Sequence, residues 1–260
     1  MNAAWTEWLK ARRSHVPWVT LSAFTVIAFV GALFMFILQD QDRARDLGLL
    51  GTKASLVGGD ATWPTYFALL AQTTAVGGFI VFGLVLTWIF GREFSQNTVK
   101  DLLALPTTRT AIVTAKFAVA AVWCSALSVY VYGLGLVAGA ILRLPGWSAA
   151  VAAAGLTKLL ATALMTILLT TPIALAASAG RGYLPGIGMM ITATFLAQIV
   201  AALGYGHYFP WSVPALFSGL AGPGRDAPGV IGYASVAVVG LGGVLTTVAW
   251  WRNADQASSH

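Results

Sequence analysis

Six long runs of apolar residues, none of which contains Asp, Glu, Lys or Arg, constrain the fold of this chain more than any other feature. Each run is long enough for a helix to cross the hydrocarbon core of a bilayer, which takes about 20 residues. A charge at the centre of a bilayer is costly, so its absence from all six runs supports the same interpretation. The runs are residues 18–38, 66–90, 117–142, 159–179, 184–203 and 230–250.

Composition excludes a soluble globule. With 58% hydrophobic and only 9% charged residues, the chain has too little polar side-chain surface to cover a soluble domain of 260 residues. The sequence therefore predicts a single all-α transmembrane domain over 1–260, a polytopic membrane protein with six transmembrane helices.

The positions of Lys and Arg predict the orientation. If the N-terminus is cytoplasmic, the segments on that side hold more Lys and Arg than the outer segments do, as the positive-inside rule requires. An even number of spans then places both termini in the cytoplasm. The formal net charge of +6 is dispersed along this edge, where it favours anionic lipid head groups rather than nucleic acid. We expect a multi-pass protein of the bacterial inner (plasma) membrane.

Two short segments outside the spans have patterns of their own. In residues 1–17, Trp5, Trp8, Leu9 and Arg12 recur at helical spacing, and the polar side is supplied by Glu7, Lys10 and Arg13. This predicts an amphipathic helix in the cytoplasmic interface. Residues 205–228 are rich in proline and aromatic residues; the prolines prevent a continuous helix, so we expect short re-entrant or interfacial outer helices that close an exit.

Residues 92–116, between the second and third spans, form an amphipathic segment. Its apolar positions recur at helical spacing from Phe94 to Leu105, and Pro106 stops the helix at Leu105. Thr107 or Thr108 can then cap a new helix that runs into the third span. On the residues alone, an amphipathic loop lying on the bilayer explains this segment as well as a docking site does.

An ordered set of residues in this segment resembles a known pattern. The set is Glu93, Thr98, Leu102, Leu103, Leu105, Pro106, Arg109 and Lys116. It is similar to the inner loop after the second span in permease subunits of the type-2 ABC exporter superfamily, of the bacitracin- and sodium-export-like six-span kind. Many members carry Gly-Thr where this chain has Asn97-Thr98, and Asn tolerates tight backbone geometry better than most residues.

The resemblance implies a division of labour between subunits. The segment 92–116 would form the coupling helix, which docks on a separate ABC ATP-binding subunit, of which two copies are expected. The residues implied in this coupling are Glu93, Phe94, Thr98, Lys100, Asp101, Leu102, Leu105, Pro106 and Arg109. The chain itself has no G-x4-G-K-[ST] loop, so we expect no catalytic residue, metal ligand or cofactor in it; ATP and Mg would be bound by the partner subunit.

The resemblance also implies a dimer, because six spans are half of the twelve typical of this transporter class. A second permease chain, identical or homologous, would complete the pathway. Gly135 and Gly139 form a G-x3-G motif that permits close helix contact and is one candidate for the dimer face.

Polar side chains within the spans are the candidates to line the pathway. They are Gln72, Thr73, Thr74, Ser125, Ser128, Thr166, Thr170, Thr171 and Gln198. None is charged, which argues against an inorganic ion and favours an amphiphile: a lipid, a peptide antibiotic or a hydrophobic drug. In membrane helices, however, such hydroxyls usually bond to their own backbone or to a neighbouring helix.

Two other classes of protein remain as alternatives. A membrane-embedded accessory or immunity protein would keep the spans but would not need an amphipathic inner helix. A polytopic enzyme is less favoured: Phe217-Ser218-Gly219 lacks the first glycine of an intramembrane serine protease motif, and His15, His207 and His260 are too scattered to bind a metal.

Overall fold

The computed structural model describes residues 3–40, 60–99, 107–220 and 228–253, and all secondary structure in these ranges is helical. The described residues contain six helices long and apolar enough to cross a membrane. They are α2 (Val16–Gln39), the α4–η2–α5 unit (Trp63–Ser95), α7 (Arg109–Ile141), α8 (Ala149–Ala179), α9 (Tyr183–Ala202) and α11 (Val230–Asn253). The predicted all-α class with six spans is thereby confirmed.

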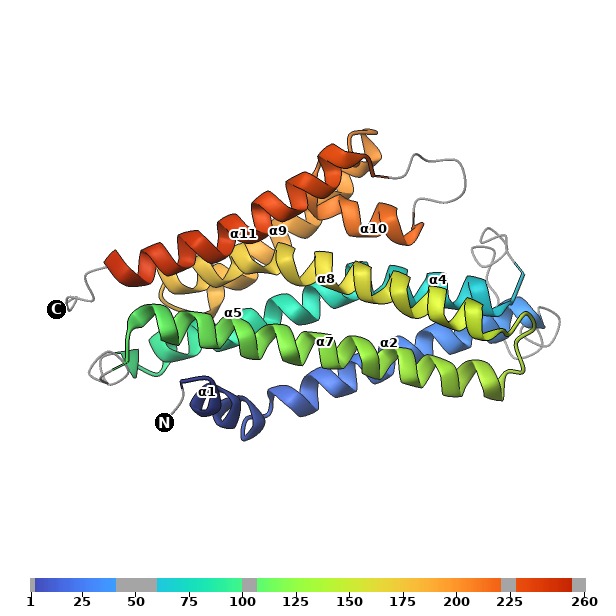
Figure 1. The fold of residues 1–260 in the computed structure, drawn as a ribbon, viewed down its shortest axis with the longest axis horizontal. Coiled ribbons are helices and arrows are strands. Elements are labelled where there is room, and N and C mark those ends of the chain that lie inside the picture. The colour runs from blue at the N-terminus through green and yellow to red at the C-terminus, as the bar shows by residue number, and fades with distance from the viewer. Residues whose placement is uncertain (1–2, 41–59, 100–106, 221–227, 254–260) are drawn as a thin grey trace.

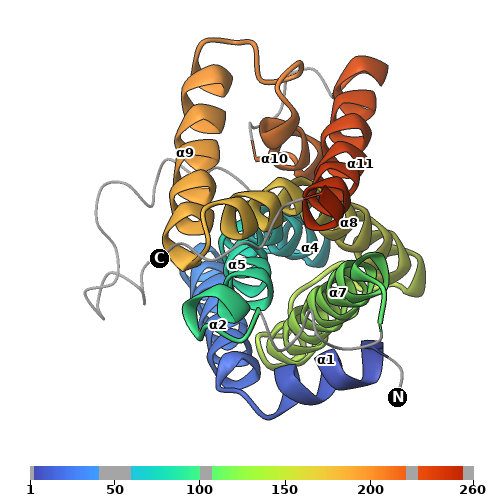
Figure 2. The same cartoon turned by 90° about the vertical axis from the view of Figure 1, so that its left-hand side faces the viewer.

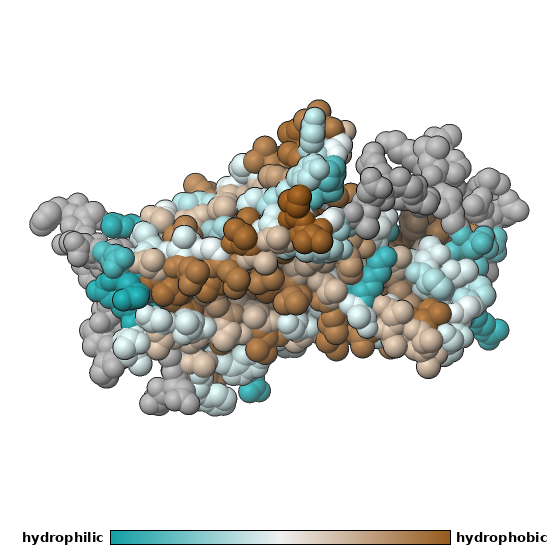
Figure 3. Space-filling view, turned by 45° about the horizontal axis from the view of Figure 1, so that its top comes forward, coloured by the Kyte–Doolittle hydropathy of each residue, from teal (hydrophilic) through white to brown (hydrophobic). Residues whose placement is uncertain are grey.

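The six long helices run along the longest axis of the molecule, and both chain termini lie at the same end (Figure 1). We call this the proximal end and the opposite end the distal end. α5 ends and α7 begins at the proximal end, and α8 contacts α4, α5, α7, α9, α10 and α11 in the middle of the bundle (Figure 2). Hydrophobic residues dominate the middle of the surface in Figure 3, and the most hydrophilic ones gather toward the two ends.

Three shorter helices accompany the spans. α1 (Ala3–Arg12) contacts α7 and α2 at the proximal end, where the sequence predicted an N-terminal helix. The short helices η3 (Pro210–Ser212) and α10 (Val213–Ser218) lie in the proline-rich segment 205–228. They are short because proline removes a backbone donor and disfavours a helical conformation at the residue before it.

Side-chain caps fix the starts of α7 and α8, and Thr62 caps α4 in the same way. Thr108 accepts a hydrogen bond from the backbone N–H of Ala111 (3.3 Å) and so begins α7, which settles which of the two adjacent threonines is the cap. Ser148 accepts from Val151 N–H (3.1 Å), and α8 therefore begins at Ala149 rather than at the expected Leu159. Lys158 consequently lies within the helix rather than in an outer loop.

The second span is not a regular helix. η2 (Thr74–Gly78) is a π-helical turn between α4 (Trp63–Thr73) and α5 (Phe79–Ser95). The hydroxyls of Thr73 and Thr74 both donate to the backbone O of Leu70, at 3.0 and 2.8 Å, on the N-terminal side of this turn. Such turns are rare and occur often at functional sites.

The G-x3-G motif of α7 is used within the chain. A side chain at Gly135 would collide with Leu70, and a Cβ at Gly139 would lie 2.5 Å from the ring of Trp63, so both glycines lie directly against α4. The sequence offered these glycines as a dimer face, and that expectation is wrong. They allow α7 and α4 of the same chain to approach closely.

Candidate functional site

Four charged side chains meet at the proximal end. Lys116 Nζ lies 3.0 Å from Glu7 Oε2 and 3.2 Å from Glu93 Oε1, and it also donates to the backbone O of Ile89 at 3.0 Å. Lys10 Nζ lies 3.1 Å from Glu7 Oε1 and 3.0 Å from Glu93 Oε1. We call Glu7, Lys10, Glu93 and Lys116 the proximal polar cluster; it contains two acids and two bases.

The proximal polar cluster joins three elements that are distant in the sequence. Glu7 and Lys10 come from α1, Glu93 from the last turn of α5 and Lys116 from the second turn of α7. The Lys116 side chain is fully buried, and its three contacts use all three donors of its ammonium group. α1 is therefore attached to both helices that flank residues 96–108.

The free energy that the cluster contributes to folding depends on the presence of all four charges. Burial of an ion pair is costly, yet removing one partner costs more, typically about 3–5 kcal/mol, because it leaves a buried charge without compensation. At the surface end of the cluster, burial disfavours the charged form of Lys10. The carboxylates of Glu7 and Glu93 outweigh that effect and raise the pKa of Lys10 above its ordinary value of 10.5.

Beyond Glu93, α5 ends in a tight turn. Thr98 N–H donates to Glu93 O (2.9 Å) and Asn97 N–H donates to Phe94 O (3.2 Å), which is the pattern of a Schellman motif. Asn97 sits at the position that requires a left-handed conformation, with φ of 55°. Glycine is usual there and Asn is the best substitute, so the Asn97-Thr98 departure from Gly-Thr keeps the geometry. The Thr98 hydroxyl also donates to Glu93 Oε2 at 2.7 Å.

The same end of the bundle is also tied to α11. Phe94 packs against the rings of Trp250 and Trp251, with centroids 5.9 and 5.6 Å away. Arg109 Nη1 donates to the backbone O of Trp251 (3.3 Å) and of Arg252 (3.2 Å), placing a cation at the C-terminal end of α11, where the helix dipole favours it. Trp251 Nε1 in turn donates to Ser178 Oγ of α8 at 3.0 Å.

Comparison with known proteins identifies the family. A family described as "ABC-2 family transporter protein" matches residues 3–197. This chain belongs to the ABC-2 transporter family. The chain is also 26% identical over 179 residues to "Bacitracin transport permease protein BCRB" of Bacillus licheniformis, a match that covers 68% of this chain and 85% of that protein.

Membership of the ABC-2 family sets the broad role of the chain. It is a membrane-embedded permease subunit of an ABC transporter, of a family whose permeases are in general not themselves catalytic. In this family the ATPase activity lies in a partner subunit. The matched residues run from α1 into α9 and so include every member of the proximal polar cluster.

The structure describes four of the nine residues implied in coupling for this ABC-2 permease. Glu93, Phe94, Thr98 and Arg109 all make the contacts given above, and Glu93 is buried, with 3% of its surface exposed. Lys100, Asp101, Leu102, Leu105 and Pro106 lie outside the described residues.

Three members of the cluster were not among the sequence-predicted site residues. Glu7 and Lys10 were placed on the polar side of the N-terminal helix, and Lys116 was quoted only as part of the motif. In the structure the polar side that carries Glu7 faces into the protein, and Lys116 lies inside α7 rather than at a loop edge. The sequence shows only that each of these charges lies next to an apolar run. That position does not identify an ion-pair partner more than 100 residues away.

Most of the pathway candidates in this ABC-2 permease bond within their own helices. The hydroxyls that donate to a backbone carbonyl three or four residues earlier are those of Thr73, Thr74, Ser128, Thr166, Thr170 and Thr171. Thr171 also reaches Gly240 O of α11 at 2.7 Å. Ser125 is exposed and Gln72 is half-buried. Gln198 lines a cavity of about 170 Å³ between η2, α9 and α10, which we call the distal cavity.

Proposed function

We propose that two copies of this permease, or one copy and a homologue, form the translocation pathway of an ABC exporter. Two copies of a separate ATP-binding subunit, which hold ATP and Mg, would drive it by docking on residues 92–116. The proximal end, with both termini, then faces the cytoplasm of a bacterial cell, and the chain itself holds no cofactor.

The observation that carries this proposal is that both ends of the docking segment, residues 92–116, are anchored. Its first residues are fixed by Glu93 and the Asn97 turn, and its last residues by Arg109 and Lys116. Through these residues, a displacement of the segment acts on α1, α5, α7 and α11 together. An amphipathic loop that only rested on the bilayer would have no use for a buried ion cluster at its base, because such a cluster adds positional specificity rather than stability.

These contacts distinguish two roles among the coupling residues. Thr98 donates to Glu93, and Glu93 in turn accepts from Lys116, so Glu93 and Thr98 act as positioning residues that hold the base of the segment. Phe94 and Arg109 hold it against α11. Direct contact with the ATP-binding subunit is assigned to the tip of the segment, at Lys100, Asp101, Leu102, Leu105 and Pro106.

The substrate we propose is an amphiphile. Most of the hydroxyls in the spans are satisfied by their own backbones, which leaves apolar and aromatic side chains as the surface a substrate would meet. The distal cavity has this character, since Phe79, Trp211 and Leu216 are among its walls and Gln198 and Ser212 are among its polar groups. The relative whose name refers to bacitracin transport also supports an organic substrate rather than an inorganic ion.

Co-purification tests the proposal. The tagged chain would be isolated from its native host in mild detergent, and the eluate examined for a Walker-motif subunit and for ATPase activity. We expect both with the wild type and a loss of both with Leu102→Asp. Leu203→Asp is the matched control, because it makes the same chemical change at an exposed position just after α9, far from the proximal end.

Two results would contradict the proposal. Normal recovery of the ATPase with Leu102→Asp would remove the docking role of the segment. Recovery of the wild-type chain alone, with no ATPase, would favour the accessory or immunity protein instead.

A further inference from the structure

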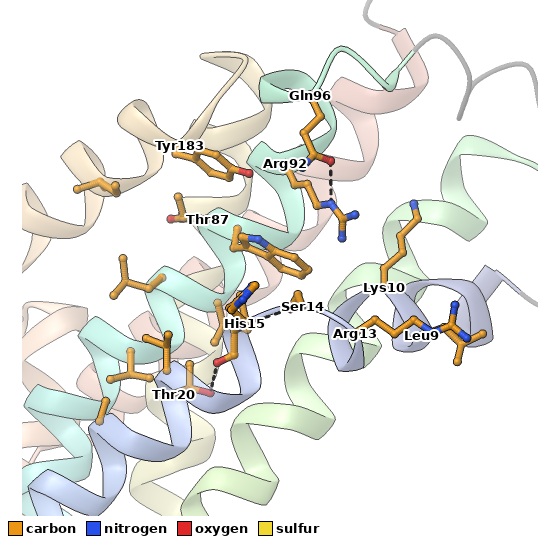
Figure 4. Close-up of a pocket in the computed structure, with 18 of the residues that line it drawn as sticks. Leu9, Lys10, Arg13, Ser14, His15, Thr20, Thr87, Arg92, Gln96 and Tyr183 are labelled. Atoms are coloured by element: carbon orange, nitrogen blue, oxygen red, sulfur yellow. Dashed lines mark hydrogen bonds between the residues drawn. The ribbon is translucent and has the colours of Figure 1, made fainter.

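A large cavity opens at the proximal end between α1, α2, α5 and the first turns of α9. Its volume is about 860 Å³ (Figure 4). We call it the proximal cavity. In Figure 4, Lys10 of α1 and Arg13, which directly follows α1, lie on one side of it, His15 and Thr20 lie on the α2 side, and Arg92 and Thr87 come from α5. It is distinct from the proximal polar cluster, with which it shares Lys10 alone.

The rim of the proximal cavity is basic. Lys10, Arg13, His15 and Arg92 line it, and no Asp or Glu is among its lining residues. Since Lys10 is neutralised within the polar cluster, Arg13 and Arg92 supply the charge that no ion pair among the described residues compensates. Arg92 is held in place: its Nε donates to Gln96 Oε1 at 3.0 Å, and its guanidinium carbon lies 5.0 Å from the centre of the Trp88 ring. An anion entering from the membrane surface would meet an oriented guanidinium group.

Below the rim the cavity becomes an apolar trough. Val16, Val19 and Ala23 of α2 face Val81, Leu84 and Val85 of α5 along it. These residues belong to the two spans, so the trough runs from the proximal edge of the membrane toward its middle. A basic rim above an apolar trough is the pattern of a lipid head-group pocket.

We propose that the proximal cavity binds an anionic phospholipid from the adjacent membrane leaflet. The phosphate lies between Arg13 and Arg92, and one acyl chain fills the trough between α2 and α5. The bound lipid braces α1 and α2 against α5 and α9. A small soluble anion does not explain the trough, and a second copy of this chain would bring a basic proximal end of the same sign against the rim.

Lipid retention by the purified full-length chain tests this proposal independently of any ATPase. The chain would be exchanged from detergent into mixtures of phosphatidylglycerol and phosphatidylcholine, and bound lipid counted by native mass spectrometry. We expect wild-type protein to retain phosphatidylglycerol in preference to phosphatidylcholine. Arg13→Gln with Arg92→Gln should weaken phosphatidylglycerol retention about tenfold or more, since each basic residue at a membrane surface contributes measurably to anionic lipid binding.

The matched control is Arg181→Gln with Arg252→Gln. It removes the same charge from exposed positions at the same end without touching the cavity, and it should retain phosphatidylglycerol normally. Equal loss in this control would overturn the proposal, because it would show general attraction to a basic surface. An absence of preference for phosphatidylglycerol in the wild type would overturn it too.

A second variant tests the trough. Ala23→Trp fills the trough and leaves the basic rim intact, so it should reduce lipid retention while the protein still elutes as a folded species. Normal retention would contradict the placement of the acyl chain. Efficient disulfide crosslinking of an Ala23→Cys variant to a second copy would identify the cavity as an interface between chains and would also overturn the proposal.

Discussion

The proximal and distal ends of this bundle are held together by different physics. At the proximal end, ion pairs and side-chain hydrogen bonds join α1, α5, α7 and α11 at defined atoms. Toward the distal end, aromatic rings pack among α4, α7 and the residues before α8: Trp63 on Trp147 at 4.7 Å and Phe67 on Tyr132 at 5.4 Å. A hydrogen bond from Tyr132 OH to Ala152 O (2.8 Å) accompanies them. The comparison therefore separates a proximal end held mainly by charged groups from a distal end held mainly by close packing.

The largest effect is expected from Lys116→Met. The variant leaves the buried carboxylates of Glu7 and Glu93 with Lys10 alone, and should lower the free energy of unfolding by about 3–5 kcal/mol. Denaturant unfolding in detergent measures it. Lys158→Met is the matched control, expected to change stability by only about 0.5 kcal/mol, because Lys158 is half-buried on α8 with no ion pair to the described residues.

Adding Glu7→Gln to Lys116→Met sharpens this test. The second change removes one of the two carboxylates left in excess, so the double variant should be more stable than Lys116→Met alone. If Lys116→Met were as stable as the wild type, the cluster would not be a structural anchor. The proposed difference between the two ends would then be wrong for the proximal end.

The distal side is tested by Gly139→Leu. The added side chain would collide with Trp63 and should cost about 1–3 kcal/mol through overpacking. Gly133→Leu on the same helix is its control and should be nearly neutral, because nothing lies within 4 Å of a Cβ at that position. The comparison predicts that Gly139→Leu lowers stability without reducing recovery of the ATP-binding subunit; reduced recovery would mean that the two ends are not separable.

A smaller effect is expected at the turn after α5. Asn97→Val places a β-branched residue at φ of 55° and should cost about 1–2 kcal/mol. Asn97→Gly should be neutral or slightly stabilising, since glycine adopts this conformation without strain. Since the turn sets the direction of the docking segment, Asn97→Val should also reduce recovery of the ATP-binding subunit. Equal recovery with Asn97→Val and Asn97→Gly would show that the turn has no part in coupling.

The smallest effect is expected from pH. Because the pKa of Lys10 is raised in the folded protein, its contribution is fully present below its ordinary value of 10.5 and is lost only as pH rises through the folded-state value. The attachment of α1 through Lys10 should therefore be constant between about pH 6 and pH 8. Proteolysis of the N-terminal helix over this range measures it, and a marked change would mean that another group controls the attachment.

Sequence reasoning found the spans but not how their ends are used. Hydropathy located all six helices because the cost of charge in hydrocarbon is large and local. It placed the start of the fourth span at Leu159 because Lys158 precedes it, whereas in the structure α8 begins at Ala149 and includes Lys158. Sequence reasoning identified the left-handed turn in part, since the resemblance implies glycine where Asn97 stands.

The proximal polar cluster could not be derived in the same way. It depends on Glu7, Glu93 and Lys116 meeting from three elements, and a single sequence contains no signal for that meeting. The G-x3-G motif is a different case. Gly135 and Gly139 correctly predicted a close helix contact, but the sequence suggested a second chain as the partner, whereas the partner is α4 of the same chain.

The π-helical turn at Thr74–Gly78 has a consequence for how this permease can bend. A wider turn accommodates one more residue than the α-helix around it, so the faces that α4 and α5 present to their neighbours are out of step with each other. A single continuous rod would carry a twist applied at one membrane surface unchanged to the other. Here the rod already has a joint partway along, beside the distal cavity that Ala75 and Val76 help to line. A rotation of α5, the part nearer the proximal end, can therefore be reduced or increased at the π-helical turn before it reaches α4, and no regular α-helical turn has to break.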